Sequence, residues 1–261
     1  MNLVLQRVKQ ATVALALFNE GDPKRPFNIV GSGFCVHPRG IVVTCEHVLS
    51  AFMKKPLAQA VSESGADKSA TSIQFPIETA VPYAVFFLTG LSSEELIAFP
   101  IRTTMGMAKT DHDLGMVKLQ GHKAFAKGFP FLEIAPYAQI HEGQDVGTCG
   151  FPLGTYLYDQ IGTVTSSFTK GIVSSVIPAH GVPIQYLKGF QLNLVATHGN
   201  SGGPVFVFDS GKVFGALERG VVGNDGKLLQ GLSVAAPVYP AFDHDTVNRM
   251  LNAQPGKVPI G

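Results

Sequence analysis

The sequence of 261 residues contains no tryptophan, only three cysteines and few charged residues. Three cysteines are odd in number and too few for a disulfide framework, so we expect Cys35, Cys45 and Cys149 to be buried free thiols in a cytoplasmic protein. Asp, Glu, Lys and Arg together make up 15% of the chain and leave a net charge of +1, with no block of one sign. This balance excludes a strongly basic surface, and we expect no nucleic-acid partner.

Long apolar runs that could cross a membrane are also missing. The longest stretch without a charged residue, 189–208, contains four glycines and several side-chain amides. The N-terminal stretch 2–18 is interrupted by Arg7 and Lys9 and has no small-residue cleavage site. We therefore expect no membrane partner, and we interpret the N-terminal stretch as a first strand.

Glycine and proline, with 29 and 17 residues, are abundant, and hydrophobic residues make up 45% of the chain. Short apolar runs recur between turn residues, a pattern typical of antiparallel hairpins. It predicts two barrel-like halves, 1–120 and 144–261, with a connector over 121–143 and a short C-terminal helix at 245–251. Residues 51–72 lack any period and predict a long surface loop, which is either a passive insertion or a lid.

One turn carries a small nucleophile among glycines: Gly199-Asn200-Ser201-Gly202-Gly203-Pro204. Glycines allow unusual φ values, and without a Cβ atom they let a substrate carbonyl approach backbone N–H groups. A turn of this kind can bind a developing oxyanion. By itself it is more often structural, because Gly and Ser are ordinary turn residues.

A histidine and an aspartate accompany the serine. His47 follows the apolar run 41–44, and Asp113 precedes the apolar run 114–119. Asp111 is the alternative acid, since it would face the same side of a strand, but the apolar run begins directly after Asp113. No further His or Cys pair has metal-ligand spacing, so we expect neither a metal nor a cofactor.

These residues lie in segments that resemble the trypsin-fold serine peptidases, and most closely the HtrA/Deg-like branch. The first matching segments are Gly31-Ser32-Gly33-Phe34, Gly40-Ile41-Val42-Val43-Thr44, His47-Val48, Asp113-Leu114 and the turn 199–204. Further ones are Gly150-Phe151-Pro152, Thr163-Val164-Thr165, Gly171-Ile172-Val173-Ser174 and Leu232-Ser233-Val234-Ala235-Ala236-Pro237. The resemblance implies an all-β fold of two six-stranded antiparallel β-barrels and a serine endopeptidase that cleaves unfolded or extended polypeptide.

The resemblance also implies roles for individual residues. A serine hydroxyl is a weak nucleophile, so His47 would take its proton and Asp113 would hold the imidazole in the right tautomer. The backbone N–H groups of Gly199 and Ser201 would form the oxyanion hole. Asn200 stands where trypsin-like zymogens carry an aspartate, so activation by a new N-terminus is not expected.

A substrate pocket is implied on both sides of the nucleophile. Its walls would be Val195, Ala196, Thr197, Glu218, Arg219 and Gly220, and His198 either flanks the substrate side chain or is simply exposed. No acid falls at the pocket floor, where Val195 would lie, so small or medium apolar side chains are the expected substrates. The backbone from Leu217 to Gly220 could pair with extended substrate.

Two other functions fit the same residues. One is a catalytically silent peptide-binding module with its triad out of register, and the other is a small-ester hydrolase. The polypeptide substrate is the expected partner in the leading hypothesis. The resemblance gives only weak support to the expectation of a homo-oligomer, because the N-terminal segment is short.

Overall fold

The protein is described from a computed structural model. The structure describes residues 2–18, 27–52, 71–74, 82–88, 95–101, 103–106, 112–121, 123–154, 156, 164–178, 181, 183–223, 226, 228–239, 247, 248, 251 and 252. Most of the predicted loop 51–72, part of the predicted C-terminal helix and the alternative acid Asp111 lie outside these residues. Among the described residues, no helix has the length and apolar character needed to cross a membrane.

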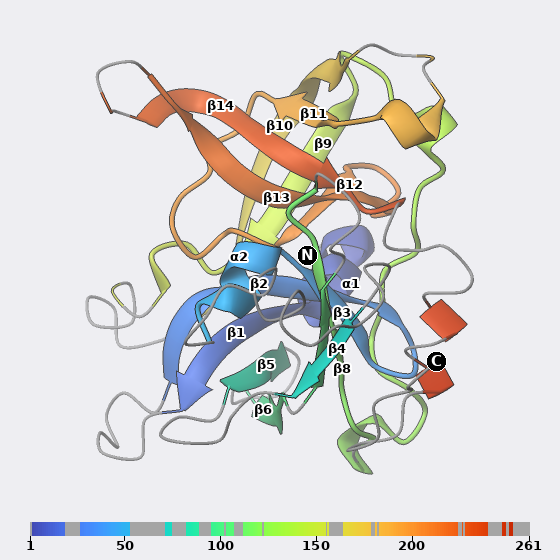
Figure 1. Cartoon of the computed structure of the whole chain (residues 1–261), viewed down its shortest axis with the longest axis vertical. Coiled ribbons are helices and arrows are strands. Elements are labelled where there is room, and N and C mark those ends of the chain that lie inside the picture. The colour runs from blue at the N-terminus through green and yellow to red at the C-terminus, as the bar shows by residue number, and fades with distance from the viewer. Residues whose placement is uncertain are drawn as a thin grey trace.

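Strands dominate and form two antiparallel units, which confirms the predicted all-β class (Figure 1). The first unit contains β1 (Thr12–Phe18), β2 (Phe27–His37), β3 (Ile41–Thr44), β4 (Thr71–Gln74), β5 (Pro82–Leu88), β6 (Glu95–Pro100), β7 (Thr103–Gly106) and β8 (Gly115–Lys118). They form one eight-stranded sheet in the order β4-β7-β8-β3-β2-β1-β5-β6. The described strands of this unit therefore number eight rather than six.

This sheet must be strongly curled. Strand β6 lies at one edge of the sheet and β7 lies next to the other edge, yet only two residues join them. Two linking residues can span no more than about 10 Å between their flanking residues, so the two edges approach each other. The first unit thus has the barrel-like shape that the apolar pattern predicts.

The second unit is a closed barrel of six strands, as expected. Its strands are β9 (Asp145–Gly150), β10 (Ser167–Ile177), β11 (Gly189–Leu192), β12 (Pro204–Val207), β13 (Val213–Val222) and β14 (Leu228–Pro237). They close in the order β10-β11-β14-β13-β12-β9. In Figure 1 this barrel lies above the first unit, and the short helix α2 (Glu46–Ser50) lies where the two units meet.

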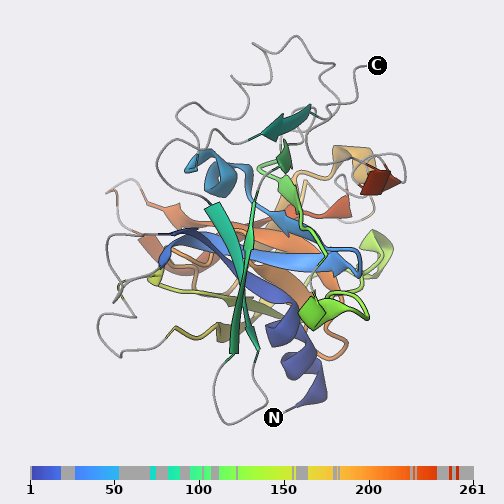
Figure 2. The same cartoon turned by 90° about the horizontal axis from the view of Figure 1, so that it is seen from below.

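The N-terminal stretch differs from its prediction as a strand. Residues Leu3–Ala11 form helix α1, and β1 begins only at Thr12. Asn2 caps the helix by accepting a hydrogen bond from the Val4 N–H (2.9 Å), and the helix buries Val8 and Ala11. The prediction of a strand rested on the apolar residues alone and overlooked their helical spacing. Figures 1 and 2 place α1 and α2 on opposite faces of the molecule.

The connector 121–143 contributes to the core instead of only crossing the surface. It contains two short 3-10 turns, Lys123–Phe125 and Tyr137–Gln139. Phe129 and Leu132 are buried in a cluster dominated by the first unit, whereas Ala135 and Ile140 are buried in the core of the second barrel. The connector therefore ties the two cores together.

Candidate active site

His47 and Asp113 are held together by two hydrogen bonds. The backbone N–H of His47 donates to Asp113 Oδ1 (2.9 Å), and His47 Nδ1 bonds Asp113 Oδ2. His47 follows β3 on α2, and Asp113 directly precedes Leu114 and β8, which pairs with β3. The pairing of these two strands thus brings the two side chains to the same end of the sheet.

The environment of this pair separates their pKa values. The hydrogen bond that the His47 ring donates to Asp113 raises the pKa of His47, and the negative charges of Asp113 and Glu218 add to this effect against the desolvation of the ring. Burial by itself would raise the pKa of Asp113, but hydrogen bonds from the His47 ring and from the backbone N–H groups of His47 and Glu46 hold it below its ordinary value. Asp113 is therefore ionised at neutral pH.

Ser201 lies on the predicted glycine turn, which packs against Thr44 and Cys45, the residues that lead into α2 and His47. Its hydroxyl donates to the Glu218 carbonyl oxygen (3.2 Å), and no hydrogen bond joins it to His47 in the described part of the chain. A Cβ added to Gly202 would lie 2.2 Å from both the Ser32 carbonyl oxygen and Thr44 Oγ1. The turn therefore packs directly against the segment that leads into His47.

The glycines of this turn are required by its backbone. Gly199 and Gly202 have φ values of +91° and +83°, which other residues rarely adopt. A Cβ on Gly199 would lie only 2.1 Å from the Phe151 carbonyl oxygen. Within the described chain, neither the Gly199 N–H nor the Ser201 N–H donates a hydrogen bond, so both donors remain available.

Glu218 and Arg219 on β13 differ strongly in exposure. The register of β13 with β14 shifts between Leu217 and Arg219, so Glu218 occupies a bulge, a feature that re-aims side chains. The Glu218 side chain is 17% exposed and that of Arg219 is 72% exposed, and the two form an ion pair (3.2 Å). Desolvation raises the pKa of Glu218, and the nearby Asp113 charge raises it further against the effect of Arg219.

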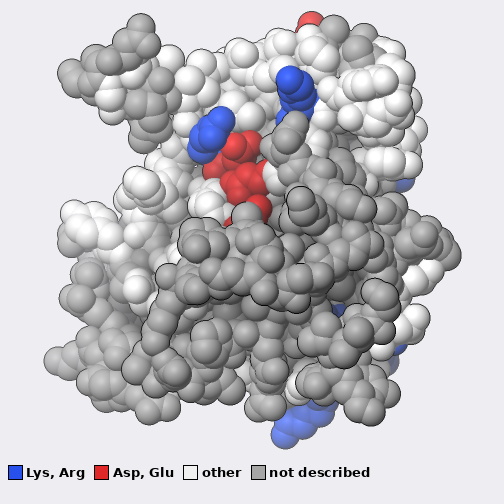
Figure 3. Space-filling view, in the orientation of Figure 1, with Lys and Arg blue, Asp and Glu red and all other residues white. Residues whose placement is uncertain are grey.

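Acidic side chains accordingly gather at the site. Figure 3 shows one group of them in a hollow of this face, over the region of β13 and α2, with basic side chains at its rim. The charges of Asp113, which precedes β8, and of Glu218 on β13 both act on His47. The site therefore combines one imidazole with an excess of negative charge.

The remaining residues that were predicted to bind substrate differ in their exposure to solvent. Val195 and His198 are exposed, Ala196, Thr197 and Gly220 are half-buried, and Leu217 is buried in the core. Strand β12 pairs with β13 as far as Ala216, and Leu217 then accepts from the Gly202 N–H (2.7 Å) and donates to the Gly203 carbonyl oxygen (2.8 Å). Beyond Leu217, this edge of β13 has no strand partner among the described residues. This edge borders Ser201.

One group of side chains has the composition of a metal site. The ligand atoms of Cys45, His47 and Asp113 lie within 4.8 Å of one another. His47 Nδ1 is already bonded to Asp113, and the Cys45 thiol bonds the Leu217 carbonyl oxygen (3.3 Å). Burial raises the pKa of Cys45 well above its ordinary value, and thiolate is the form that binds metal. The group is therefore better suited to its internal hydrogen bonds than to a metal.

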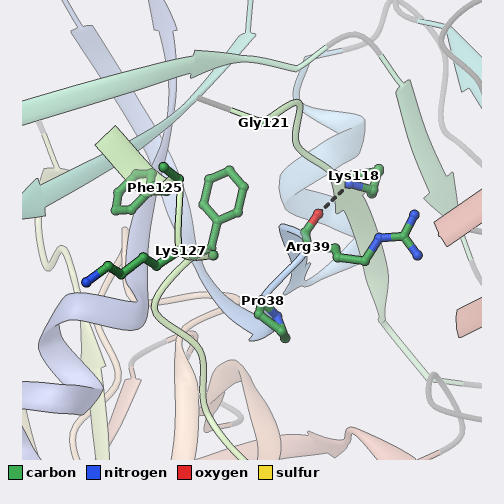
Figure 4. Close-up of a pocket in the computed structure, with 9 residues that line it drawn as sticks. Pro38, Arg39, Lys118, Gly121, Phe125 and Lys127 are labelled. Atoms are coloured by element: carbon green, nitrogen blue, oxygen red, sulfur yellow. Dashed lines mark hydrogen bonds between the residues drawn. The ribbon is translucent and has the colours of Figure 1, made fainter. Parts of the chain in front are cut away.

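A cavity of about 450 Å³ lies elsewhere, at the beginning of β3. It is lined by Pro38, Arg39, Lys118, Gly121, Phe125, Ala126, Lys127, Gly128 and Phe129. Lys118 Nζ bonds the Arg39 carbonyl oxygen, and Figure 4 shows the Arg39 and Lys127 side chains extending in opposite directions. Its cationic groups therefore do not converge on one point, and the cavity is separate from the residues around Ser201.

Sequence reasoning missed one residue of this region, Ser32. It is fully buried on β2, and its hydroxyl donates to the Gly199 carbonyl oxygen (2.6 Å). The available signal was a serine between two glycines, Gly31 and Gly33, in an otherwise apolar strand. Only the packing of the two units relates this signal to the nucleophile turn.

Comparison with known proteins gives consistent matches. Residues 31–215 match the trypsin-like peptidase domain family. A probable periplasmic serine endoprotease DegP-like from Pseudomonas savastanoi pv. phaseolicola is 27% identical over 243 residues, which cover 93% of this chain and 38% of that protein. A protein of the same name from Halomonas elongata is 25% identical over 214 residues, covering 82% of this chain and 34% of its own length.

Solved structures of the HtrA-type protease AlgW are also similar. The structure with a tripeptide has a TM-score of 0.57 at 17% identity, and the structure with a decapeptide has a TM-score of 0.58 at 16% identity. Each match covers 95% of this chain, and 62% and 66% of the respective AlgW chains. At this identity the likeness concerns the fold, and the chain spans little more than a third of the curated relatives.

Proposed function

Because this chain belongs to the trypsin-like peptidase family, we propose that it is a serine endopeptidase with Ser201 as nucleophile, His47 as general base and Asp113 as the orienting carboxylate. The observation that carries the proposal is the doubly hydrogen-bonded His47 and Asp113 pair, together with a serine turn that packs against the segment leading into His47 and has two available N–H donors. These are the parts that acyl transfer to a serine requires.

The proposed reaction begins with rotation of the Ser201 hydroxyl away from the Glu218 carbonyl oxygen toward His47 Nε2. Asp113 binds Nδ1–H, so Nε2 is left as the acceptor that takes the hydroxyl proton as Oγ attacks the substrate carbonyl carbon. The imidazolium returns this proton to the leaving amine, and the C–N bond breaks. Water then attacks the acyl-enzyme, again with His47 as base, and releases the carboxylic acid and Ser201.

The N–H groups of Gly199 and Ser201 are proposed to bind the oxyanion. Negative charge develops on the substrate carbonyl oxygen as Ser201 attacks, and fixed donors stabilise this charge without reorganisation. Asn200, between them, has its own N–H bonded to the Thr197 carbonyl oxygen (3.1 Å), which holds the turn closed.

The proposed substrate is unfolded or extended polypeptide. The edge of β13 beyond Leu217, which has no strand partner among the described residues on that side, suits an extended strand, and main-chain pairing tolerates many sequences. The AlgW structures hold peptides, which agrees with this assignment. The neighbouring pocket would be formed by Val195, Ala196, Thr197 and His198 on one side and by 217–220 on the other, with a preference for small or medium apolar side chains.

The order of the strands along the chain supports a proposal in which each of the two units contributes part of the catalytic triad. We place His47 and Asp113 in an N-terminal unit, 1–120, and Ser201 in a C-terminal unit, 144–261, with 121–143 between them. The cytoplasmic compartment and a homo-oligomer stay predictions. The three free buried cysteines favour the former, whereas the curated relatives are named periplasmic.

The test compares the protein with Ser201→Ala. Both are treated with a fluorophosphonate probe and incubated with unfolded casein and with a small ester. We expect labelling at Ser201, cleavage of casein, and a loss of turnover of about 10⁴- to 10⁶-fold in the variant, since such residues act as a unit. An unlabelled protein would instead be a binding module, and labelling with ester turnover but intact casein would identify an esterase.

A further inference from the structure

We propose that Ser32 is a positioning residue that fixes the nucleophile turn so that the Gly199 and Ser201 N–H groups are aligned before substrate binds. The inference rests on the proposed function, because it assigns those two N–H groups to the oxyanion. Ser32 belongs to β2 in the first unit, whereas the turn belongs to the second. It therefore acts across the junction between the two units.

Ser32 makes three hydrogen bonds to two turns of the second unit. Its hydroxyl donates to the Gly199 carbonyl oxygen (2.6 Å) and accepts from the Phe151 N–H (3.0 Å). Its backbone N–H donates to the Ser201 carbonyl oxygen (2.8 Å). One fully buried residue thus contacts the residues on both sides of Asn200.

Ser32 is itself held in place. Thr44 Oγ1 donates to the Ser32 carbonyl oxygen (2.7 Å), and Thr44 is the last residue of β3, three residues before His47. One chain of hydrogen bonds from the segment before His47 to the nucleophile turn therefore runs through Thr44 and Ser32. A shift of Ser32 would move Ser201 relative to the imidazole as well as the oxyanion donors.

The bonds around Gly199 define which way its N–H points. The His198 carbonyl oxygen accepts from the Leu153 N–H (2.6 Å), and a trans peptide places its C=O and N–H on opposite sides. The Gly199 N–H is therefore directed away from Leu153. The next peptide is held by Ser32 on its carbonyl and by Thr197 on the Asn200 N–H.

The turn that contains Leu153 is strained and depends on the same serine. Leu153 has a φ of +59°, which a leucine rarely adopts, and its side chain is 45% exposed. The only described residue that bonds the Phe151 N–H at the start of this turn is Ser32. Ser32 thereby supports both partners of the His198 to Leu153 hydrogen bond.

Serine is the residue type that this position accepts. A Cβ added to Gly150 would lie 2.9 Å from Ser32 Oγ, so there is little space for a larger side chain. The group must also donate to one backbone atom and accept from another at once, which a hydroxyl does. Alanine fits the space but leaves the Gly199 carbonyl and the Phe151 N–H without this partner.

The experiment compares Ser32→Ala with Thr12→Val. Thr12 is the matched control, because it is a buried hydroxyl of the same unit that donates to the Val8 carbonyl oxygen (2.9 Å) and also contacts the Cys149 thiol, but makes no hydrogen bond to the described residues of the nucleophile turn. The measurements are kcat and KM on a fluorogenic peptide, the affinity for a peptide boronic acid, and the melting temperature. Ser32→Cys, which keeps a weak donor and acceptor, serves as the conservative variant.

We expect Ser32→Ala to lower kcat by about 10- to 100-fold with little change in KM, and to weaken boronate binding in parallel, because small displacements of catalytic groups act at this scale. Ser32→Cys should lie between Ser32→Ala and the native protein. A kcat equal to that of Thr12→Val would overturn the proposal. If Ser32→Ala does not fold, Ser32→Cys decides, since an undiminished kcat and boronate affinity there would also overturn it.

The failure of the proposed function would look different. If the native protein is not labelled by fluorophosphonate, the serine peptidase assignment itself is wrong. If the native protein is labelled and turns over peptide but Ser32→Ala does so equally well, only the role of Ser32 is wrong.

Discussion

Replacing Gly199 by alanine should disable the oxyanion turn through a single methyl group. The added Cβ would lie 2.1 Å from the Phe151 carbonyl oxygen, where ordinary contact begins at about 3.4 Å. To restore ordinary contact, the backbone must move by about 1.3 Å at Gly199, the residue whose N–H is proposed to bind the oxyanion. A displacement of this size can reduce the rate about 100-fold, and the positive φ of +91° adds roughly 1–2 kcal/mol of strain.

The matched control is Gly143→Ala. Gly143 also has a positive φ, +80°, but a Cβ there would meet no atom within 4 Å. The control therefore carries the backbone strain without the clash. We expect the two variants to differ by about 100-fold or more in kcat on a fluorogenic peptide, and the Gly199 variant to react more slowly with fluorophosphonate. Equal kcat values in two folded variants would refute the reasoning from close approach.

The remaining predictions concern charge and thiol chemistry. Because the hydrogen bond that the His47 ring donates to Asp113 raises the pKa of His47, and the neutral imidazole is the proposed base, kcat/KM should rise with pH through a midpoint above the ordinary histidine value of about 6.5. A midpoint below that pH would contradict the assignment. Glu218→Gln removes a negative charge and should move this midpoint to lower pH, whereas Arg219→Gln removes a positive charge and should move it to higher pH. Shifts of both variants in one direction would argue against an electrostatic origin. Burial raises the pKa of the Cys35 thiol to about 12 and that of Cys149 to about 11, and Cys45 is buried with them. Ellman's reagent should therefore react with no thiol of the native protein and with three after unfolding, and rapid native reaction would contradict the burial.

Local sequence signals were sufficient to predict most strands of the second unit. Its strands are runs of apolar and β-branched residues between turn formers, and the closed six-stranded barrel follows the predicted pattern. The N-terminal stretch was misread, because Val4, Val8 and Ala11 are apolar in either a strand or a helix. The helical spacing and the Asn2 cap, rather than apolarity, distinguish the two.

Local sequence signals could not predict which of two neighbouring side chains is buried. Glu218 and Arg219 are neighbours in sequence, and pattern alone could not say which of the two side chains is largely buried. A bulge against β14 turns Glu218 inward and leaves Arg219 in solvent. Such a bulge depends on the pairing of two strands, which is a property of the sheet and not of either segment.

The sequence by itself determined which residue types the candidate site draws on, because His47, Asp113 and the glycine turn are each marked by their immediate neighbours. Only the tertiary structure decided how these parts are aligned. Ser32 contacts residues 167 positions away, and its hydrogen bonds exist only once both units have packed. Distances between segments so far apart are set by packing of the whole chain, which no local pattern encodes.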